Sequence, residues 1–221
     1  MGAVVTWMAL NQDGYESLLR WMFPAESVHI YQRTTLARLL GQHLAVAGLA
    51  SVIALVIGLS LGVLLLTPVG RMFRDVVMDL ASLGQVMPSI ALIAIVVPVI
   101  GYGWEPVVLA LVVYGVLPVM LNVVVGVQGV PAEMVDAARG LGMTRRQRLW
   151  RVELPLAAPV VLGGVKNMLI INVGAATLAA LVGAGGLGVP ILAGLATFNN
   201  ALILEGAIPS ALLALMIDRT L

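Results

Sequence analysis

Five apolar runs, each close to the length of a membrane crossing, constrain the fold of this chain more than any other feature. A helix needs about 20 predominantly apolar residues to cross the hydrocarbon layer of a bilayer. Runs bounded by charge, proline or glycine cover residues 44–66, 76–98, 106–127, 157–182 and 201–217. The pattern predicts an all-α membrane protein, a helical bundle of five spans.

The composition agrees with a membrane protein and excludes several kinds of site. Hydrophobic residues make up 61% of the chain and charged residues only 10%, and the mean hydropathy of +1.06 exceeds that of a solvated domain. A net charge of +1 gives no field that attracts nucleic acid, so no such partner is expected. With no cysteine, and with His29 and His43 far from any acidic cluster, we expect neither a disulfide nor a metal site, and no cofactor.

The arginines predict the orientation of the chain, because cytoplasmic loops are enriched in Lys and Arg. Arg71 and Arg74 lie between the first two runs, whereas the connections 101–105 and 183–200 contain neither Lys nor Arg. The connection between the third and fourth runs carries Arg139, Arg145, Arg146, Arg148 and Arg151. We therefore expect the N-terminus outside and the C-terminus inside, although Arg20, Arg33 and Arg38 in the outer segment weaken the bias.

Residues 1–43 precede the first run and do not resemble a signal peptide, because no basic region or cleavage site accompanies the apolar start. They are either the remnant of a further span or an interfacial segment with Trp7, Trp21 and Phe23 at the headgroups. We favour the interfacial segment. The chain thus divides into an outer segment, 1–43, and a transmembrane domain, 44–221.

Polar and small residues inside the runs suggest internal roles. Gly58 and Gly62 form a GxxxG pair that predicts a close helix contact, either with another subunit or within the same bundle. Ionisable residues at membrane depth are functional candidates, but Lys166 can also reach the inner surface and Glu205 can face water at the outer end of its span. The candidates for lining a transport path are Asn122, Asn167, Asn172 and Thr177, with interhelical hydrogen bonding as the alternative.

The largest polar stretch, residues 128–155, is predicted to form two short helices. Pro131 suits a first helical turn and Gly142 a helix stop. Thr144 and Gln147 have the spacing of a capping box for a second helix, which is expected to end before Pro155. The result is a helix-turn-helix on the cytoplasmic face. If charge were the only signal, the arginines of this loop would be explained by their role in setting the membrane topology and by binding to anionic membrane lipid.

A motif in this loop resembles the EAA signature of ABC importer permeases. The run is Asp136-Ala137-Ala138-Arg139-Gly140-Leu141-Gly142, followed after nine residues by Val152-Glu153-Leu154-Pro155. Asp136 replaces the usual Glu and Val152 the usual Ile. The match occurs in a loop that hydropathy and charge independently place in the cytoplasm, which makes it specific.

The resemblance implies a five-span bundle of the ABC importer permease type in the bacterial inner membrane. It implies that the loop is a coupling helix seated in a cleft of an ATP-binding subunit, through Asp136, Ala137, Ala138, Gly142, Val152, Leu154 and Pro155. The chain would then be no enzyme itself, because a dimer of ATPase subunits hydrolyses ATP. The other partners implied are a second copy or a homologous permease, and a separate extracytoplasmic solute-binding protein.

Further stretches resemble the osmoprotectant branch of that family, which imports glycine betaine, choline or carnitine. They lie at residues 97–103, 114–118, 156–159, 175–178 and 183–188. The resemblance as a whole covers roughly residues 40–219. The alternative within the family is a permease for an amino acid such as methionine. An ion-coupled secondary transporter would need buried carboxylates and usually an internal repeat, neither of which the sequence indicates.

The glycines at 183, 185 and 188 also match the spacing of a dinucleotide-binding loop. That loop requires a strand before it and a helix after it, within a soluble βαβ unit. Here the glycines separate two apolar runs. We expect a hinge or a re-entrant turn instead.

Overall fold

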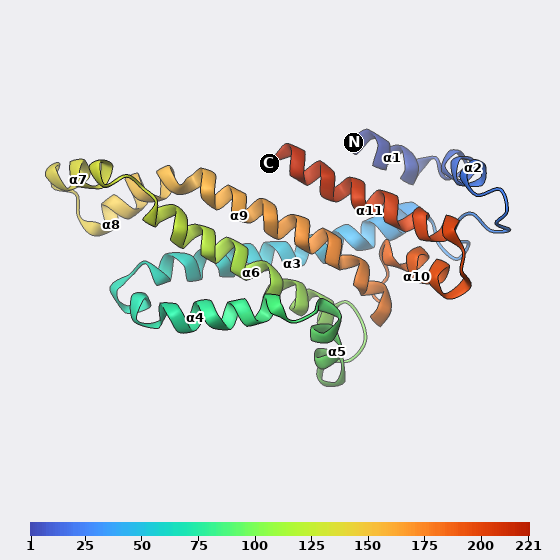
Figure 1. The fold of residues 1–221 in the computed structure, drawn as a ribbon, viewed down its shortest axis with the longest axis horizontal. Coiled ribbons are helices and arrows are strands. Elements are labelled where there is room, and N and C mark those ends of the chain that lie inside the picture. The colour runs from blue at the N-terminus through green and yellow to red at the C-terminus, as the bar shows by residue number, and fades with distance from the viewer.

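Three long helices form the centre of the molecule in a computed structural model that describes residues 1–221. They are α3 (Leu36–Leu65), α6 (Glu105–Gln128) and α9 (Leu154–Ala175), and they run along the long axis of an elongated bundle (Figure 1). No strand is present. Helix α6 packs against both α3 and α9 and is the most deeply buried of the long helices.

The glycine pair of α3 explains how closely α3 and α6 approach. A Cβ atom added at Gly58 would lie 2.8 Å from the Cβ of Val119, and one at Gly62 would lie 2.6 Å from that of Val123. Only glycine fits at such distances, because the facing valines leave no room for a side chain. The predicted GxxxG contact is therefore a contact within this bundle.

The second predicted run is not one straight helix. It is divided between α4 (Pro68–Val86) and α5 (Ser89–Ile100), whose axes differ by 98°. Pro88 disfavours a helical conformation in the residue before it, and Met87 accordingly has extended dihedral angles. Four helices are thus long and apolar enough to cross a membrane, and five if the bent pair counts as one span.

Two helices are longer than the sequence predicts. α3 begins at Leu36 rather than at residue 44, because the hydroxyl of Thr35 caps it by accepting from the amide of Arg38. The second helix of the polar loop was predicted to end before Pro155, which is wrong. A π-helical segment, η1 (Leu149–Glu153), leads directly into α9, and Pro155 lies in the first turn of α9, where its missing N–H is tolerated.

The end of the bundle away from the polar loop contains a glycine turn and a short helix. After α9 the chain passes through a 3₁₀ segment, η2 (Ala176–Val182), and then turns at Gly183, Gly185 and Gly186, all with positive φ. The expected turn is confirmed. The turn leads into α10 (Gly188–Thr197), which the sequence analysis missed, and then into α11 (Asn200–Thr220).

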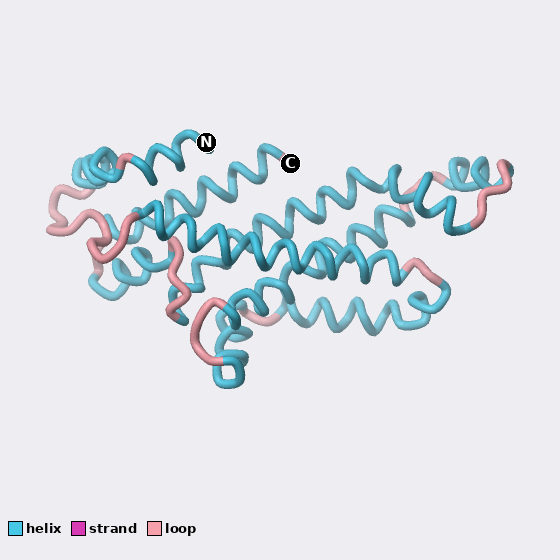
Figure 2. The backbone as a smooth tube through the Cα atoms, turned by 180° about the vertical axis from the view of Figure 1, so that it is seen from behind, coloured by secondary structure: helices cyan, strands magenta, loops and turns pink.

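The N-terminal segment lies against α11 (Figure 2). It forms α1 (Gly2–Leu10) and α2 (Gln12–Met22), and it completely buries Tyr15 and Leu19. Burial, with the nearby Glu205 carboxylate, raises the pKa of Tyr15, so the phenol keeps its proton. Its hydroxyl donates to the carbonyl oxygen of Leu204 at 3.1 Å.

Lys166 and Glu205, the two functional candidates inside the apolar runs, both have partners. Lys166 lies 3.0 Å from the carboxylate of Asp218 at the end of α11. Glu205 does not face water as the sequence suggested, because its side chain is completely buried under residues 15–31. One carboxylate oxygen accepts from the amide of Tyr31 at 2.7 Å, while the other has no partner.

Candidate functional site

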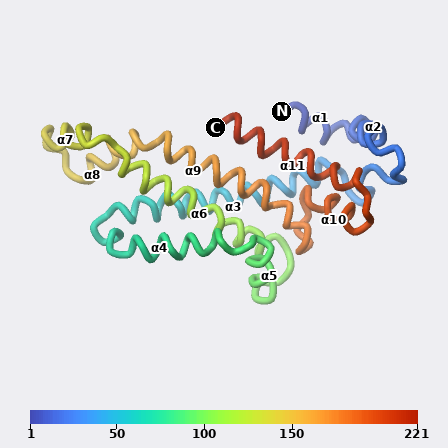
Figure 3. The backbone as a smooth tube through the Cα atoms, viewed as in Figure 1, coloured from blue at the N-terminus to red at the C-terminus, as the bar shows by residue number.

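The polar loop forms a separate projection at one end of the molecule, the loop end, beside the turn between α3 and α4 (Figure 3). It contains α7 (Ala132–Gly140) and α8 (Arg145–Arg148). Gly142 adopts a left-handed conformation with φ of 76°, which ends α7 and turns the chain. Thr144 and Gln147 then form the predicted capping box, so the helix-turn-helix is confirmed.

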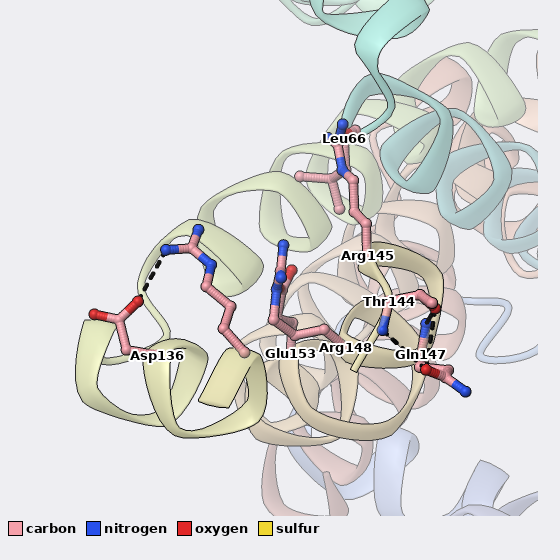
Figure 4. A network of polar contacts seen from close by, with 8 residues as sticks. Leu66, Asp136, Thr144, Arg145, Gln147, Arg148 and Glu153 are labelled. Carbon is pink, nitrogen blue, oxygen red and sulfur yellow. Dashed lines mark hydrogen bonds and ion pairs between the residues drawn. The ribbon is translucent and has the colours of Figure 1, made fainter. Parts of the chain in front are cut away.

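The signature residues differ in their exposure. Asp136, Ala137, Gly142 and Pro155 are exposed, whereas Val152 and Leu154 are half-buried and Ala138 is buried inside the loop. The carboxylate of Asp136 lies 2.9 Å from Arg139, and both side chains remain largely in solvent (Figure 4). An exposed ion pair of this kind contributes little stability, so Asp136 stays available to a partner.

Three large apolar side chains are exposed on the same projection, and the sequence analysis did not single them out as contacts. Leu141 is 78% exposed, Trp150 56% and Met134 50%. Apolar side chains exposed together outside an apolar span are typical of a protein contact. The signal available in the sequence was the presence of large apolar residues within an otherwise polar loop.

The loop is joined to the bundle in two ways. α8, η1 and α9 form one continuous helical rod from Arg145 into the bundle. In addition, the guanidinium of Arg145 donates to the carbonyl oxygen of Leu66, at the end of α3, at 2.6 Å (Figure 4). The loop is therefore attached to both α9 and α3.

A half-buried ion pair stiffens the start of this rod. Arg148 and Glu153 are 2.7 Å apart, and each side chain is only 15% exposed. The pair spans the π-helical segment, in which the regular i to i−4 hydrogen-bonding pattern is interrupted. It thus holds together the part of the rod where bending is easiest.

The four predicted path residues are not brought together. Asn172 is completely buried and donates to the hydroxyl of Ser51 at 3.0 Å, which joins α9 to α3. Asn122 donates to the carbonyl oxygen of Pro118 in its own helix, and Thr177, in η2, donates to that of Gly174 near the end of α9. Of the four residues, Asn167 is exposed, on the outer surface of α9. A role of these residues in lining a path stays a prediction.

Curated proteins similar to this chain are permeases. The osmoprotectant import permease protein OsmY of Salmonella typhimurium is 39% identical over 82% of this chain and 78% of its own length. The choline transport system permease protein OpuBB of Bacillus subtilis is 35% identical over 81% and 82%. The carnitine transport permease protein OpuCB of Listeria monocytogenes is 35% identical over 80% of both chains. These relatives confirm the resemblance carried by the loop motif.

Solved structures have the same fold at lower sequence identity. The MetNI methionine ABC transporter in an inward-facing conformation matches with a TM-score of 0.71 and 24% identity, over 83% of this chain and 91% of that one. An amino acid ABC transporter solved with histidines matches with a TM-score of 0.71 and 18% identity, over 83% and 89%. These likenesses concern the fold alone.

The family model described as binding-protein-dependent transport system inner membrane component matches residues 39–219. That range includes the loop, the rod and nearly all of the four helices long enough to cross a membrane. This chain is therefore a multi-pass inner-membrane protein and belongs to the family of binding-protein-dependent transport system inner membrane components.

Proposed function

We propose that the chain is the permease subunit of an ABC importer for a quaternary-amine osmoprotectant such as glycine betaine, choline or carnitine, driven by a separate ATPase. The observation that carries the proposal is the helix-turn-helix with the Asp136 to Pro155 signature at the end of a rigid rod. The names of relatives at 35–39% identity supply the substrate class. A methionine importer has weaker support, from fold likeness at 24% identity.

The proposed orientation places the loop end in the cytoplasm and the opposite end of the bundle, with α2, outside. The N-terminus was expected outside and the C-terminus inside, but α1 runs back along α11, and a Cβ atom added at Gly2 would lie 3.2 Å from the sulfur of Met216, so the two ends of the chain lie side by side. Arg71 and Arg74 lie at the start of α4, on the same end as the arginines of the loop. The opposite end has the glycine turn and residues 101–104, which contain no Lys or Arg. This distribution supports a topology of five spans in which α4 and α5 together make one.

The coupling step follows from the way the loop is attached. A partner ATPase would seat against exposed Ala137, Leu141 and Met134, and its closure on ATP would displace the loop. The rod and the Arg145 contact would carry that displacement into α9 and α3. A second copy or a homologous permease would complete the path, and a separate solute-binding protein would deliver the substrate.

Asn167 is the residue best placed to line such a path. Its amide is exposed on a helix that crosses the membrane, next to Gly163, whose missing side chain faces open space. An unpaired amide facing lipid is unfavourable, so a water-filled path between two permeases is the better environment for it. The face of α9 that carries Asn167 would then be turned toward the second permease.

Uptake of labelled solutes tests the proposal in cells that express the permease with its neighbouring ATPase and binding protein. Gly142→Val should abolish uptake, because a β-branched residue does not adopt the left-handed conformation of this turn. Gly142→Asn is the matched control and should retain uptake, because asparagine tolerates that conformation. Wild-type uptake of an amino acid, with none of betaine, choline or carnitine, would refute the substrate class and leave the coupling role intact.

A further inference from the structure

Arginines line a cavity at the loop end that the proposed coupling role does not use. The cavity has a volume of about 210 Å³ and lies where the loop meets the turn between α3 and α4. Its basic lining residues are Arg71, Arg139, Arg145 and Arg148, and its acidic one is Glu153. The cavity is much larger than the roughly 30 Å³ that one water occupies in the liquid.

Two of these positive charges are not neutralised by the protein. Arg148 pairs with Glu153 and Arg139 with Asp136. Arg145 donates to the carbonyl oxygen of Leu66, a neutral group that leaves the guanidinium charge uncompensated. The guanidinium of Arg71 makes neither a hydrogen bond nor an ion pair within the chain, although its backbone amide donates to the carbonyl oxygen of Thr67. The cavity therefore presents two uncompensated guanidinium groups, one from α4 and one from α8.

The start of α4 indicates the depth of this cavity in the membrane. Val69 and Met72 are 70% and 76% exposed, and Phe73 is 53% exposed, beside Arg71 and Arg74. Exposed apolar residues alternating with arginines are typical of a helix end that lies at the headgroup level. Arg71 is thus placed where lipid phosphates are found.

We propose that the cavity is a phosphate site that takes the headgroup phosphate of an anionic phospholipid. Guanidinium groups bind phosphate oxygens through paired N–H donors, which makes arginine the preferred residue for such a site. A phosphate between Arg71 and Arg145 would accept hydrogen bonds from both guanidinium groups, offset one of their two positive charges and bridge α4 to α8. The lipid would then fasten the loop to the end of the bundle, in parallel with the Arg145 contact to Leu66.

Native mass spectrometry of the purified full-length chain in detergent tests the site. The probes are phosphatidylglycerol and phosphatidylcholine, each with and without inorganic phosphate. Arg71→Gln and Arg145→Gln should each weaken binding of phosphatidylglycerol at least fivefold. Arg146→Gln is the matched control, because Arg146 is adjacent in sequence, equally charged and not part of the cavity lining; it should bind as the wild type does.

Three other outcomes of this experiment would overturn the site or the lipid as its ligand. Equal losses in all three variants would overturn the site, because they would reflect the general surface charge. Phosphatidylcholine bound as tightly as phosphatidylglycerol would also overturn it. Displacement of the lipid by millimolar inorganic phosphate, with the same dependence on Arg71, would keep the phosphate chemistry but overturn the lipid as its source. The inner-leaflet position depends on the proposed orientation, whereas the binding assay requires no transport and can fail or succeed independently of it.

Discussion

The two ends of this molecule differ in how they are held together. The loop end is an exposed helix-turn-helix held mostly by contacts between residues three to five positions apart, such as Thr144 with Gln147 and Asp136 with Arg139, and joined to the bundle by the contact of Arg145 with Leu66. At the opposite end, Tyr15 and Tyr31 contact Leu204 and Glu205, more than 170 residues away along the chain. The long-range contacts at the opposite end contribute to stability, whereas the exposed surface of the loop end is accessible to a partner.

Replacing Tyr15 tests the stabilising end with the largest expected effect. Tyr15→Ala should lower the free energy of unfolding by about 3–5 kcal/mol, because it empties a fully buried aromatic site. Tyr15→Phe keeps the ring and should cost only about 1 kcal/mol for the lost hydrogen bond. Denaturant titration in micelles measures both. A Tyr15→Ala protein as stable as the wild type would show that α2 is not fastened to α11.

The centre of the bundle should respond to a single added methyl group. Gly62→Ala brings a Cβ atom into a space where that of Val123 lies at 2.6 Å, and such overpacking typically costs about 1–3 kcal/mol. Gly48→Ala, on the same helix but with nothing within 4 Å, should be neutral or slightly stabilising. The melting temperature in detergent distinguishes the two variants. Equal values for both would contradict the close contact of α3 with α6.

Replacing Glu205 tests whether the buried carboxylate stabilises the fold through its hydrogen bond. Glu205→Leu leaves the amide of Tyr31 without an acceptor and should cost about 1–3 kcal/mol, as expected for a buried unsatisfied donor. Glu205→Gln keeps an acceptor oxygen and should lose less. The same micelle titration compares them. Equal losses for Gln and Leu would show that the negative charge, which both variants lack, rather than the hydrogen bond stabilises this end.

Asp136 should show the smallest change in stability and a large change in transport. Because its side chain is 66% exposed, Asp136→Lys should alter the free energy of unfolding by less than about 0.5 kcal/mol. If the loop couples to an ATPase, uptake should nevertheless fall at least tenfold at an unchanged protein level. Glu133→Lys, another exposed acidic residue on the same helix, is the control and should transport normally. Normal uptake by Asp136→Lys would separate the signature from coupling.

The features predicted correctly from the sequence depend on residues close together in the chain. The Gly142 stop and the capping box follow from spacing within one or two helical turns, and each apolar run is a continuous segment of about 20 residues. The motif that indicated the family is also local, and the relatives confirm the family itself. Local geometry determines these features whatever the rest of the chain does.

The predictions that failed involve the continuation or packing of helices. Pro88 and Pro155 both follow helical segments, yet one marks a bend of 98° and the other lies within a continuing rod. A proline excludes one hydrogen bond, but the packing of neighbouring helices decides whether the axis bends there. For the same reason the end of a helix is harder to predict than its existence.

The sequence by itself thus determined the membrane class, the polar helix-turn-helix and its signature, because hydropathy and turn chemistry act locally. Only the tertiary structure decided that Glu205 is buried, that Arg145 contacts the end of α3, and that Arg71 and Arg145 face one cavity. Arg145 and Leu66 are 79 positions apart in the chain. Contacts of this kind arise from the docking of whole helices, and no pattern within a single helix specifies which side chains will meet.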